Sequence, residues 1–403
     1  MIVRLLSALV IAALAMQTTF AADKPLKVFI LVGQSNMQGH AETRTLEHMG
    51  QDPRTAPLRD KMLDKNGEPK TIDDVWISYL TDGGERQGPL TVGYGATEKK
   101  IGPELAFGIV MHEKLQEPIL LIKTAWGGKS LNTDFRPPSA GEYKFPEETV
   151  KLFERNKIDL AAKQAARKEV TGKYYKLMVD HVKKVLADIG KVDPDYDPQQ
   201  GYELAGLVWF QGWNDMVDRD TYPSREQANG YGAYGEVMAD FIRDVRKDFS
   251  APNMPVVIGV IGVGGPTSEY VDGAVRYQKV HQNIRDAMAS PAEMPEFKGT
   301  VAAVLTENYW DKELRDLKIR EGKLNDQLKK LQAEKQLSRQ EQNAERDRLF
   351  QEEFSEQEQA ALKNGISNQE YHYLGSAKIL SGIGEGFAEA MLQMQDAPAD
   401  TSK

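Results

Sequence analysis

The first residue with clear chemical potential is a serine that directly follows an apolar segment near the start of the chain. Ser35 stands in the run VGQSNMQG at 32–39, immediately after the apolar stretch 26–32. A serine at the carboxyl end of a buried strand, among residues that permit tight turns, can expose its hydroxyl and point its own N–H at an oxyanion. The chain contains no cysteine, so thiol chemistry is excluded and a nucleophile has to be an oxygen. The pattern indicates nucleophilic acyl transfer at Ser35.

A serine nucleophile requires a base, and histidine is the usual one. The histidines of the chain are His40, His48, His112, His181, His281 and His372. The third, fourth and fifth of them fall inside helical patterns away from strand ends, where a packing or surface role is expected. His40 lies close to Ser35 and could line a pocket, but it has no evident orienting partner. Position alone does not show which of the remaining histidines is the base.

Four segments of the chain together resemble the sequence blocks of a known group of esterases. They are GQSNM at 33–37, GPELAFG at 102–108, KTAWGGKS at 123–130 and WFQGWND at 209–215. In this order they resemble the blocks of the SGNH hydrolases, and GQSNM is similar to the signature of the sialate O-acetylesterase and acetylxylan esterase branch. The run GWND departs from that branch, which usually carries QGESD there, and matches the wider superfamily instead.

The resemblance implies a catalytic serine and a catalytic histidine. Ser35 would be the nucleophile, and His372, just before a closing C-terminal helix, would be the base. The family usually carries an aspartate two or three residues before this histidine, where the present chain has Gln369 and Glu370. Glu370 is predicted to orient the imidazole, since a carboxylate on the far ring nitrogen also stabilises its charged form. Two alternatives stay open: Asp215 takes this role, or serine and histidine act as a dyad supported by a backbone carbonyl or water.

Donors for the oxyanion are expected from three places in the sequence. One is the N–H of Ser35 itself. Gly127 and Gly128 follow an apolar run, and glycine lets backbone N–H groups approach a substrate oxygen without an intervening side chain. Gln211 and Asn214 follow the next apolar run, and a side-chain amide aimed at the developing charge stabilises it when water is excluded. The sequence leaves open which of these two amides makes the contact.

Several residues near these blocks are candidates for binding a sugar. Trp126 and Trp213 each stand beside a predicted oxyanion element, and sugar rings present C–H faces that stack on tryptophan. Asp134 and Arg136 could hydrogen-bond sugar hydroxyls, and Gln34 precedes the nucleophile directly. Packing under the loop for the tryptophans, and an ion pair that pins the loop for Asp134 and Arg136, are the alternatives.

The elements that must position these residues alternate along the chain. Apolar runs typical of buried strands occur at 26–32, 118–125, 204–210, 255–263 and 300–306. Helical spacing occurs between them at 104–115, 174–186, 234–249 and 274–288. This alternation predicts an α/β fold, a three-layer α/β/α sandwich around a mostly parallel sheet, as the resemblance also implies. Residues 40–100, rich in Gly, Pro, Asp and Thr, are predicted as a long loop region.

A charged segment at 311–363 interrupts the alternation. Leucines recur at heptad spacing in its first half, at Leu317, Leu324 and Leu331. Ser338 followed by Glu341 has the pattern of a capping box, which predicts a second helix and a turn near 336–339. We expect an inserted helical hairpin, either simply solvated or serving as a dimerisation or docking arm. The predicted organisation is therefore a signal peptide at 1–22, an esterase domain at 23–310, the insertion at 311–363, a closing piece with the histidine at 364–395 and a disordered tail at 396–403.

Charge and the N-terminus limit where the protein acts. The formal net charge is −9, which argues against nucleic acid or anionic membranes as partners. Residues 1–22 begin with a basic residue, continue as an apolar run and end in small residues, the layout of a secretory signal. Because that run is shorter than the ~20 residues that span a bilayer, a membrane anchor is the less favoured alternative. We expect a secreted or periplasmic protein.

These observations favour a serine esterase that removes O-acetyl groups from carbohydrate, either acetylated polysaccharide or sialic acid. The sequence has no spacing of His and carboxylates typical of a metal site, and the mechanism requires no cofactor. Two other functions are compatible with the same residues. One is an SGNH lipase or thioesterase with another acyl substrate. The other is a noncatalytic carbohydrate-binding protein, suggested by the missing aspartate.

Overall fold

The computed structural model describes residues 24–335 and 338–396. The predicted signal peptide at 1–22 lies outside these residues, as do part of the predicted turn near 336–339 and all but the first residue of the predicted tail. Within the described ranges, no helix has an apolar stretch long enough to span a bilayer.

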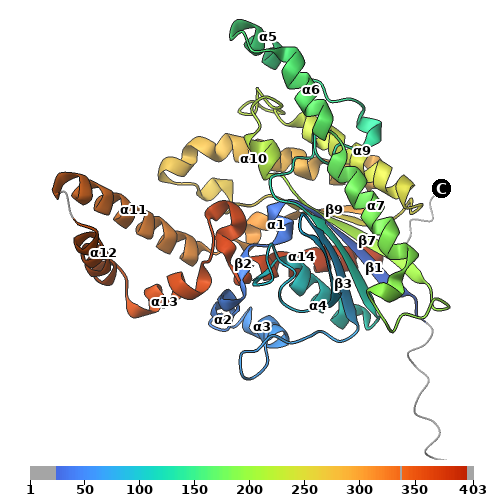
Figure 1. Ribbon diagram of the computed structural model, residues 1–403, viewed down its shortest axis with the longest axis horizontal. Coiled ribbons are helices and arrows are strands. Elements are labelled where there is room, and N and C mark those ends of the chain that lie inside the picture. The colour runs from blue at the N-terminus through green and yellow to red at the C-terminus, as the bar shows by residue number, and fades with distance from the viewer. Residues whose placement is uncertain (1–23, 336–337, 397–403) are drawn as a thin grey trace, which may run out of the picture.

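A sheet of seven strands forms the centre of the fold (Figure 1). In spatial order the strands are β4 (Gly84–Pro89), β3 (Val75–Thr81), β6 (Ile119–Ala125), β1 (Leu26–Gly33), β7 (Tyr202–Phe210), β8 (Val256–Val260) and β9 (Val301–Leu305). Neighbouring strands pair in parallel except β4, which runs antiparallel to β3 at the edge. The mostly parallel sheet predicted from the sequence is confirmed. Because the chain builds first one side of β1 and then the other, the carboxyl end of β1 is the expected ligand position.

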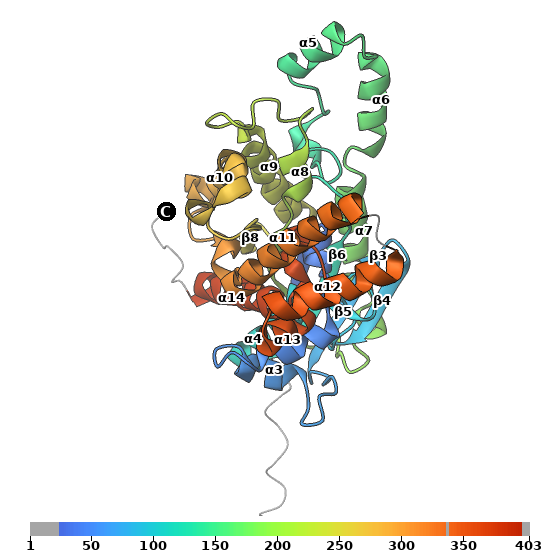
Figure 2. The same ribbon diagram turned by 90° about the vertical axis from the view of Figure 1, so that its left-hand side faces the viewer.

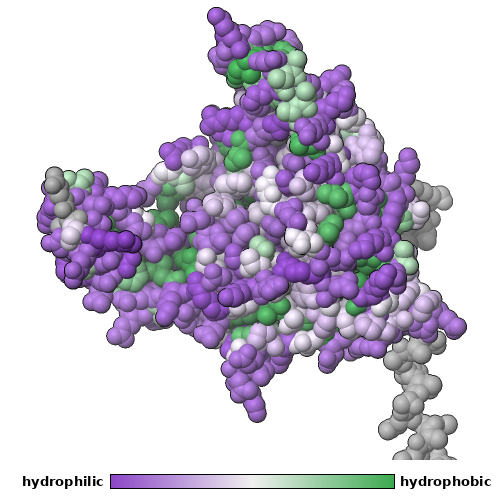
Figure 3. Space-filling view, in the orientation of Figure 1, coloured by the Kyte–Doolittle hydropathy of each residue, from purple (hydrophilic) through white to green (hydrophobic). Residues whose placement is uncertain are grey.

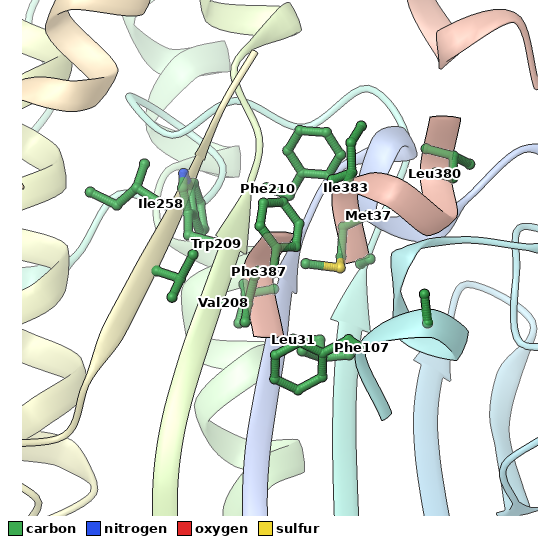
Figure 4. Packing of buried hydrophobic residues seen from close by; sticks show 14 of the residues in the cluster. Leu31, Met37, Phe107, Val208, Trp209, Phe210, Ile258, Leu380, Ile383 and Phe387 are labelled. Atoms are coloured by element: carbon green, nitrogen blue, oxygen red, sulfur yellow. The ribbon is translucent and has the colours of Figure 1, made fainter. Parts of the chain in front are cut away.

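Helices cover both faces of this sheet. On one face lie α4 (Pro103–Leu115) and α14 (Ala377–Asp396), and on the other α7 (Lys173–Ala187), α9 (Gly232–Asp248) and α10 (Gln278–Ala289). Neighbouring residues of β7 face the two layers: the ring of Trp209 lies 4.6 Å from that of Phe241, and the ring of Phe210 lies 5.3 Å from that of Phe387 (Figure 4). Burial on both faces explains why the central strands are continuous apolar runs rather than alternating ones.

The region 40–100 is not the long loop predicted from its composition. It contains β2 (Ala41–Glu42), α2 (Leu46–Met49), α3 (Ala56–Met62), β3, β4 and β5 (Lys100–Ile101). The prediction was wrong for two reasons: the composition of the whole region hid the strand pattern VWISYLT of β3, and β4, with the sequence GERQGP, lies at the edge of the sheet, where a strand needs no apolar run. A further pair, α5 (Glu147–Arg155) and α6 (Leu160–Val170), stands away from the sheet (Figures 1 and 2).

The described part of the charged insertion folds as three helices rather than a pair. They are α11 (Lys312–Lys335), α12 (Arg339–Glu353) and α13 (Glu356–Gly365). The predicted capping box of Ser338 and Glu341 starts α12, and a second box of Ser355 and Glu358 starts α13. The insertion projects from the body, and its surface is mostly hydrophilic, with hydrophobic residues where it joins the body (Figure 3).

Candidate active site

The predicted nucleophile lies at the carboxyl end of the central strand. Ser35 is the first residue of α1 (Ser35–Gln38), a single turn that follows β1 directly. Gly33 makes this turn possible, since a Cβ there would lie 2.2 Å from the carbonyl oxygen of Phe210. Ser35 as a residue is 9% exposed, and it lies at the central strand from which the chain builds the sheet in both directions.

A buried ion pair holds the other end of this turn. Lys123 Nζ donates to Glu104 Oε2 at 2.7 Å, and neither side chain is exposed to solvent. The same ammonium donates to the carbonyl oxygens of Gln38, at 2.9 Å, and of Tyr94, at 2.8 Å. Gln38 is the last residue of α1, so the ion pair fixes the backbone that carries Ser35. Neither charged residue was predicted to have a role, although a lysine within an apolar run is a signal of one.

Gln34 bridges the ends of β1 and β7 rather than facing a ligand. Its side-chain Nε2 donates to Asn214 Oδ1 at 3.1 Å and lies 3.5 Å from Ser35 Oγ. Its Oε1 accepts from the backbone N–H groups of Gly212 and Asn214, both at 3.3 Å, and from Gln211 Nε2 at 3.2 Å. The prediction that Gln34 binds substrate is corrected, because protein groups occupy its amide and its residue is 1% exposed.

Asp215 organises the loop after β6 instead of contacting the histidine. Its buried carboxylate accepts from the N–H of Leu131 at 2.7 Å, the N–H of Asn132 at 3.1 Å, Gln211 Nε2 at 2.6 Å and the Tyr222 hydroxyl at 3.1 Å. Burial raises the pKa of Asp215 to about 6, although these four donors favour the charged form. The alternative in which Asp215 completes the triad is therefore not supported.

The same network distinguishes the two candidate amides for the oxyanion. Gln211 Nε2 has three acceptors, Asp215, Gln34 Oε1 and the Lys129 carbonyl, and Gln211 Oε1 accepts from the Tyr234 hydroxyl. The amide of Gln211 is thus fully used. Asn214 differs, because Gln34 occupies only its Oδ1, and its Nδ2 makes no hydrogen bond within the described residues. Asn214 is therefore the amide whose N–H donors are free to bind an oxyanion.

The glycines after β6 lie beside the nucleophile. A Cβ built on Gly127 would be 4.0 Å from the Cβ of Ser35 and 3.1 Å from Gln38 Oε1. Gly128 has a φ of +73°, which favours glycine, and no atom lies within 4 Å of its Cβ position. The backbone of this pair therefore borders an open space next to the Ser35 side chain, as an oxyanion donor requires.

His372 lies in a turn that packs against α1. The turn spans Glu370–Gly375, and Tyr373 and Leu374 adopt the left-handed region at φ of 53° and 59°. Such backbone is costly for residues with side chains, and here the buried Tyr373 hydroxyl holds it by accepting from the Gly262 N–H at 2.8 Å. The turn is thus built to present His372 at the edge of the sheet where Ser35 lies.

Asn368 orients the imidazole of His372. The Oδ1 of Asn368 lies 3.0 Å from His372 Nδ1, and since an amide oxygen only accepts, Nδ1 carries the proton. The unprotonated nitrogen is then Nε2, which makes no hydrogen bond among residues 24–335 and 338–396. Ser35 Oγ and the imidazole are likewise not hydrogen-bonded to each other in the described chain. Glu370, which was predicted to orient the imidazole, instead lines a neighbouring cleft with Arg315.

A second histidine covers the face of His372. The ring of His40 stacks on that of His372 with centroids 3.9 Å apart, and Lys100 Nζ donates to His40 Nδ1 at 3.4 Å. Burial, followed by the charge of Lys100, lowers the pKa of His372 to about 4. Burial, followed by His372 and Lys100, lowers the pKa of His40 to about 3. Both rings are neutral near pH 7, as a general base must be.

Three of the predicted sugar-binding residues contact other parts of the protein. Trp126 is 2% exposed and packs on Tyr174, with ring centroids 5.0 Å apart. Asp134 Oδ2 accepts from the N–H of Ser130 at 2.9 Å, and the Arg136 guanidinium donates to the Gly141 and Ala140 carbonyls at 2.8 and 2.7 Å. These predictions are corrected: Trp126 is a core residue, and Asp134 and Arg136 pin the loop after β6.

Trp213, the other tryptophan predicted to bind sugar, is less enclosed than Trp126. It is partly exposed, lines a cleft of about 600 Å³ and lies 5.7 Å from the ring of Tyr371, between centroids. Tyr371, which also lines this cleft, contacts the candidate base, since its ring centroid lies 4.5 Å from that of His372, so the cleft adjoins the candidate active site. Within the described residues, no group of three or more His, Asp or Glu side chains is placed to hold a metal ion.

Comparison with known proteins bears on this arrangement. No curated protein sequence matches the chain significantly. Among solved structures, a protein from Arabidopsis thaliana is similar at 18% identity over 70% of this chain and 86% of its own, with a TM-score of 0.38. A carbohydrate acetylesterase from Xanthomonas citri is similar at 11% identity over 69% of this chain and 49% of its own, with a TM-score of 0.39.

The family comparison is the decisive one. The model of the family described as carbohydrate esterase, sialic acid-specific acetylesterase, matches residues 25–298. The matched span includes Ser35, Gly128 and Asn214 and ends before His372. Because it covers more than half of the chain, the protein belongs to this family of carbohydrate esterases and is a carboxylic ester hydrolase.

Proposed function

We propose that the protein removes O-acetyl groups from carbohydrate through an acetyl-serine intermediate, with Ser35 as nucleophile and His372 as base. One observation carries the proposal. One edge of the sheet brings together the groups that the reaction needs: Ser35, the open backbone at Gly127 and Gly128, the free Nδ2 of Asn214 and the turn of His372. Nucleophile, base and oxyanion donors are the groups that acyl transfer requires.

The proposed reaction follows from the hydrogen bonds of His372. Asn368 keeps the proton on Nδ1, so the lone pair of Nε2 takes the proton of Ser35 Oγ as that oxygen attacks the acetyl carbonyl. Catalytic hydrogen bonds often form only when substrate is bound, and the serine–histidine contact is expected to form then. The N–H groups of Ser35 and Gly128 and the Asn214 amide hold the oxyanion.

The tetrahedral intermediate then collapses. The bond to the sugar oxygen breaks, His372 returns its proton to that oxygen, and the acetyl group stays on Ser35 as an ester. A water molecule, deprotonated by the same imidazole, attacks the acetyl-serine, and acetate leaves as the serine regains its proton. The proposed substrate is an acetylated polysaccharide or an acetylated sialic acid. Export by residues 1–22 would place the enzyme outside the cytoplasm, where such carbohydrates are found.

Acetate release tests the proposal. Native protein is expected to release acetate from p-nitrophenyl acetate and from acetylated carbohydrate, and Ser35→Ala and His372→Ala should each lower kcat by about 10³-fold or more. Ser139→Ala and His112→Ala are matched controls, since both residues lie outside the site, and they should keep native activity. A native protein that releases no acetate from any of these substrates would refute the esterase proposal. Such a protein would point to the noncatalytic, carbohydrate-binding function instead.

A further inference from the structure

The cleft beside His372 is formed partly by the charged insertion. Arg315 and Ile319 of α11 line it, opposite Tyr270 and Tyr277 from the segment before α10. Ion pairs hold the insertion there: Glu269 contacts Lys312 at 2.6 Å and Arg315 at 4.0 Å. In Figure 2, α11 crosses the face of the molecule below α8 (Trp213–Val217) and α10. The insertion is thus a wall of the space next to the active site.

The position of the cleft suits the sugar alcohol, which is the leaving group of the reaction. Trp213 and Tyr371, which line it, are the chain neighbours of the oxyanion residue Asn214 and the base His372. If an acetyl group lies against Ser35, an alcohol portion that extends toward Trp213 and Tyr371 enters this cleft. A volume of about 600 Å³ is within the ~300–1,000 Å³ typical of ligand sites.

The lining includes large apolar side chains that are partly exposed to solvent. Tyr371 is 41% exposed, Tyr277 44%, Val271 58% and Ile319 40%. Large apolar side chains that gather in one concave place, instead of being scattered, mark binding surfaces. Aromatic rings among them suit the C–H faces of sugar rings.

The charge of the lining is opposite to that of the whole protein. Four guanidinium groups line the cleft, those of Arg219, Arg225, Arg276 and Arg315, against the two carboxylates of Glu269 and Glu370. Glu269 is already engaged with Lys312. Neither Arg219 nor Arg276 takes part in an ion pair within the described residues. A chain of net charge −9 therefore presents spare arginines next to its active site, and arginine is the side chain best suited to hold a carboxylate.

We propose that this cleft binds the sugar chain of an acetylated polyuronate, with the C–H faces of its rings on the aromatic side chains and its carboxylates on the arginines. The insertion is then a specificity element, because it supplies Arg315 and Ile319. This inference rests on the proposed esterase function, since it names the substrate class of the same site. A neutral acetylated glycan would use the aromatic faces but not the guanidinium groups.

The double variant Arg219→Gln, Arg276→Gln tests the charge. Michaelis constants are measured for acetylated polygalacturonate and for acetylated xylan, a neutral glycan. We expect KM to rise about tenfold for the acidic substrate, as for a lost charge-assisted hydrogen bond, and to change less than twofold for the neutral one. Lys279→Gln, which removes an exposed charge nearby that does not line the cleft, is the matched control and should leave both values unchanged. Equal changes for both glycans, or no change for either, would overturn the proposal.

The role of the insertion is tested separately. Ile319→Ala and Arg315→Ala should raise KM for acetylated polygalacturonate, whereas Lys330→Ala, at an exposed position of the same helix, should not. A cleft without a role in binding would give native KM values in all three variants. Calorimetric titration of Ser35→Ala with unacetylated oligogalacturonate keeps the test independent of catalysis. If native protein releases no acetate, but oligogalacturonate binds and this binding is lost in the arginine double variant, the esterase proposal fails and the cleft assignment stands. If oligogalacturonate does not bind, the cleft assignment is refuted.

Discussion

The imidazole rings of His40 and His372 lie face to face, with centroids 3.9 Å apart and planes at 1° to each other. Lys100 Nζ donates to Nδ1 of His40, so its cationic charge lies close to both rings. Burial removes hydration from a protonated His372, and Lys100 repels the added charge; both effects lower the pKa of His372, to about 4. Burial and the nearby ammonium of Lys100 therefore keep the proposed base neutral over a wide pH range.

The pH profile should report this arrangement. Activity needs neutral His372, so kcat/KM is expected to fall on the acid side around pH 4 and to be level from about pH 5 through neutrality. Lys100→Met removes the repulsion that opposes protonation, which raises the pKa of His372 and moves the acid limb to higher pH. The limb is measured with p-nitrophenyl acetate between pH 3.5 and 8. Lys99→Met is the matched control and should keep the native profile, and an unmoved limb in Lys100→Met would contradict the assignment.

Asn368 should act as a positioning residue for the base. Asn368→Ala removes the acceptor of His372 Nδ1–H, and kcat is expected to fall about 10- to 100-fold. This is less than the ~10⁴-fold loss on replacing a triad aspartate, because a neutral amide orients the ring without stabilising its charge. Asn368→Asp should restore orientation and raise the pKa of His372, since a nearby carboxylate favours the charged ring. Its acid limb should therefore move to higher pH.

Two further variants decide between Asn368 and the residue expected from the sequence. Gln369→Ala alters a neighbouring exposed side chain and should keep native kcat. If Glu370→Gln abolished kcat on p-nitrophenyl acetate while Asn368→Ala did not, the orienting role would belong to Glu370 after all.

Replacement of Asn214 and replacement of Gln211 should affect the protein differently. Asn214→Ala removes the spare amide donor, and kcat is expected to fall about 10²- to 10³-fold with KM nearly unchanged. Gln211→Ala removes the donor that joins Asp215 and Gln34, so it should lower the melting temperature as well as activity. Steady-state kinetics and thermal unfolding of both variants separate the two roles. The reverse pattern, stability lost in Asn214→Ala and only kcat lost in Gln211→Ala, would exchange the assignments.

The central sheet could be predicted because its strands are buried on both faces. Runs such as 26–32 and 204–210 are nearly all apolar, with Lys27 as the one charged residue, and they form β1 and β7. Edge elements carry no such signal, and β4, with its glycines, charges and proline, was taken for a loop. The insertion was found from its charge, but its function as a wall of the cleft depends on how α11 packs against the segment before α10, which no local pattern encodes.

A site residue could be predicted only where its residue type and its local sequence both indicate its role. Ser35 follows a strand and belongs to a recognisable block, so the sequence alone makes it the candidate nucleophile. Asn368 reaches His372 through a turn in which Tyr373 and Leu374 adopt left-handed backbone, and neither residue type announces that conformation. Trp126 was misassigned because a tryptophan before two glycines has the same sequence whether its ring points to solvent or to the core.

The ion pair of Lys123 and Glu104 links the stability of the fold to the geometry of the nucleophile. Both side chains are fully buried, and the pair is joined at 2.7 Å. Lys123→Met leaves the Glu104 carboxylate without its partner and should lower the free energy of unfolding by about 3–5 kcal/mol. It also frees the carbonyl of Gln38 at the end of α1, so kcat should fall in whatever fraction remains folded.

The double variant Lys123→Met, Glu104→Gln tests the cause of that loss. A neutral amide can still accept from the Gly102 N–H, as Glu104 Oε1 does at 2.9 Å, and no uncompensated charge remains buried. Denaturant unfolding should therefore show the double variant to be more stable than Lys123→Met alone, while its kcat stays below native because the Gln38 carbonyl still lacks the ammonium. Lys163→Met, on the exposed arm helix α6, is the matched control. Native stability in Lys123→Met would mean that the buried charge is not what holds the nucleophile turn.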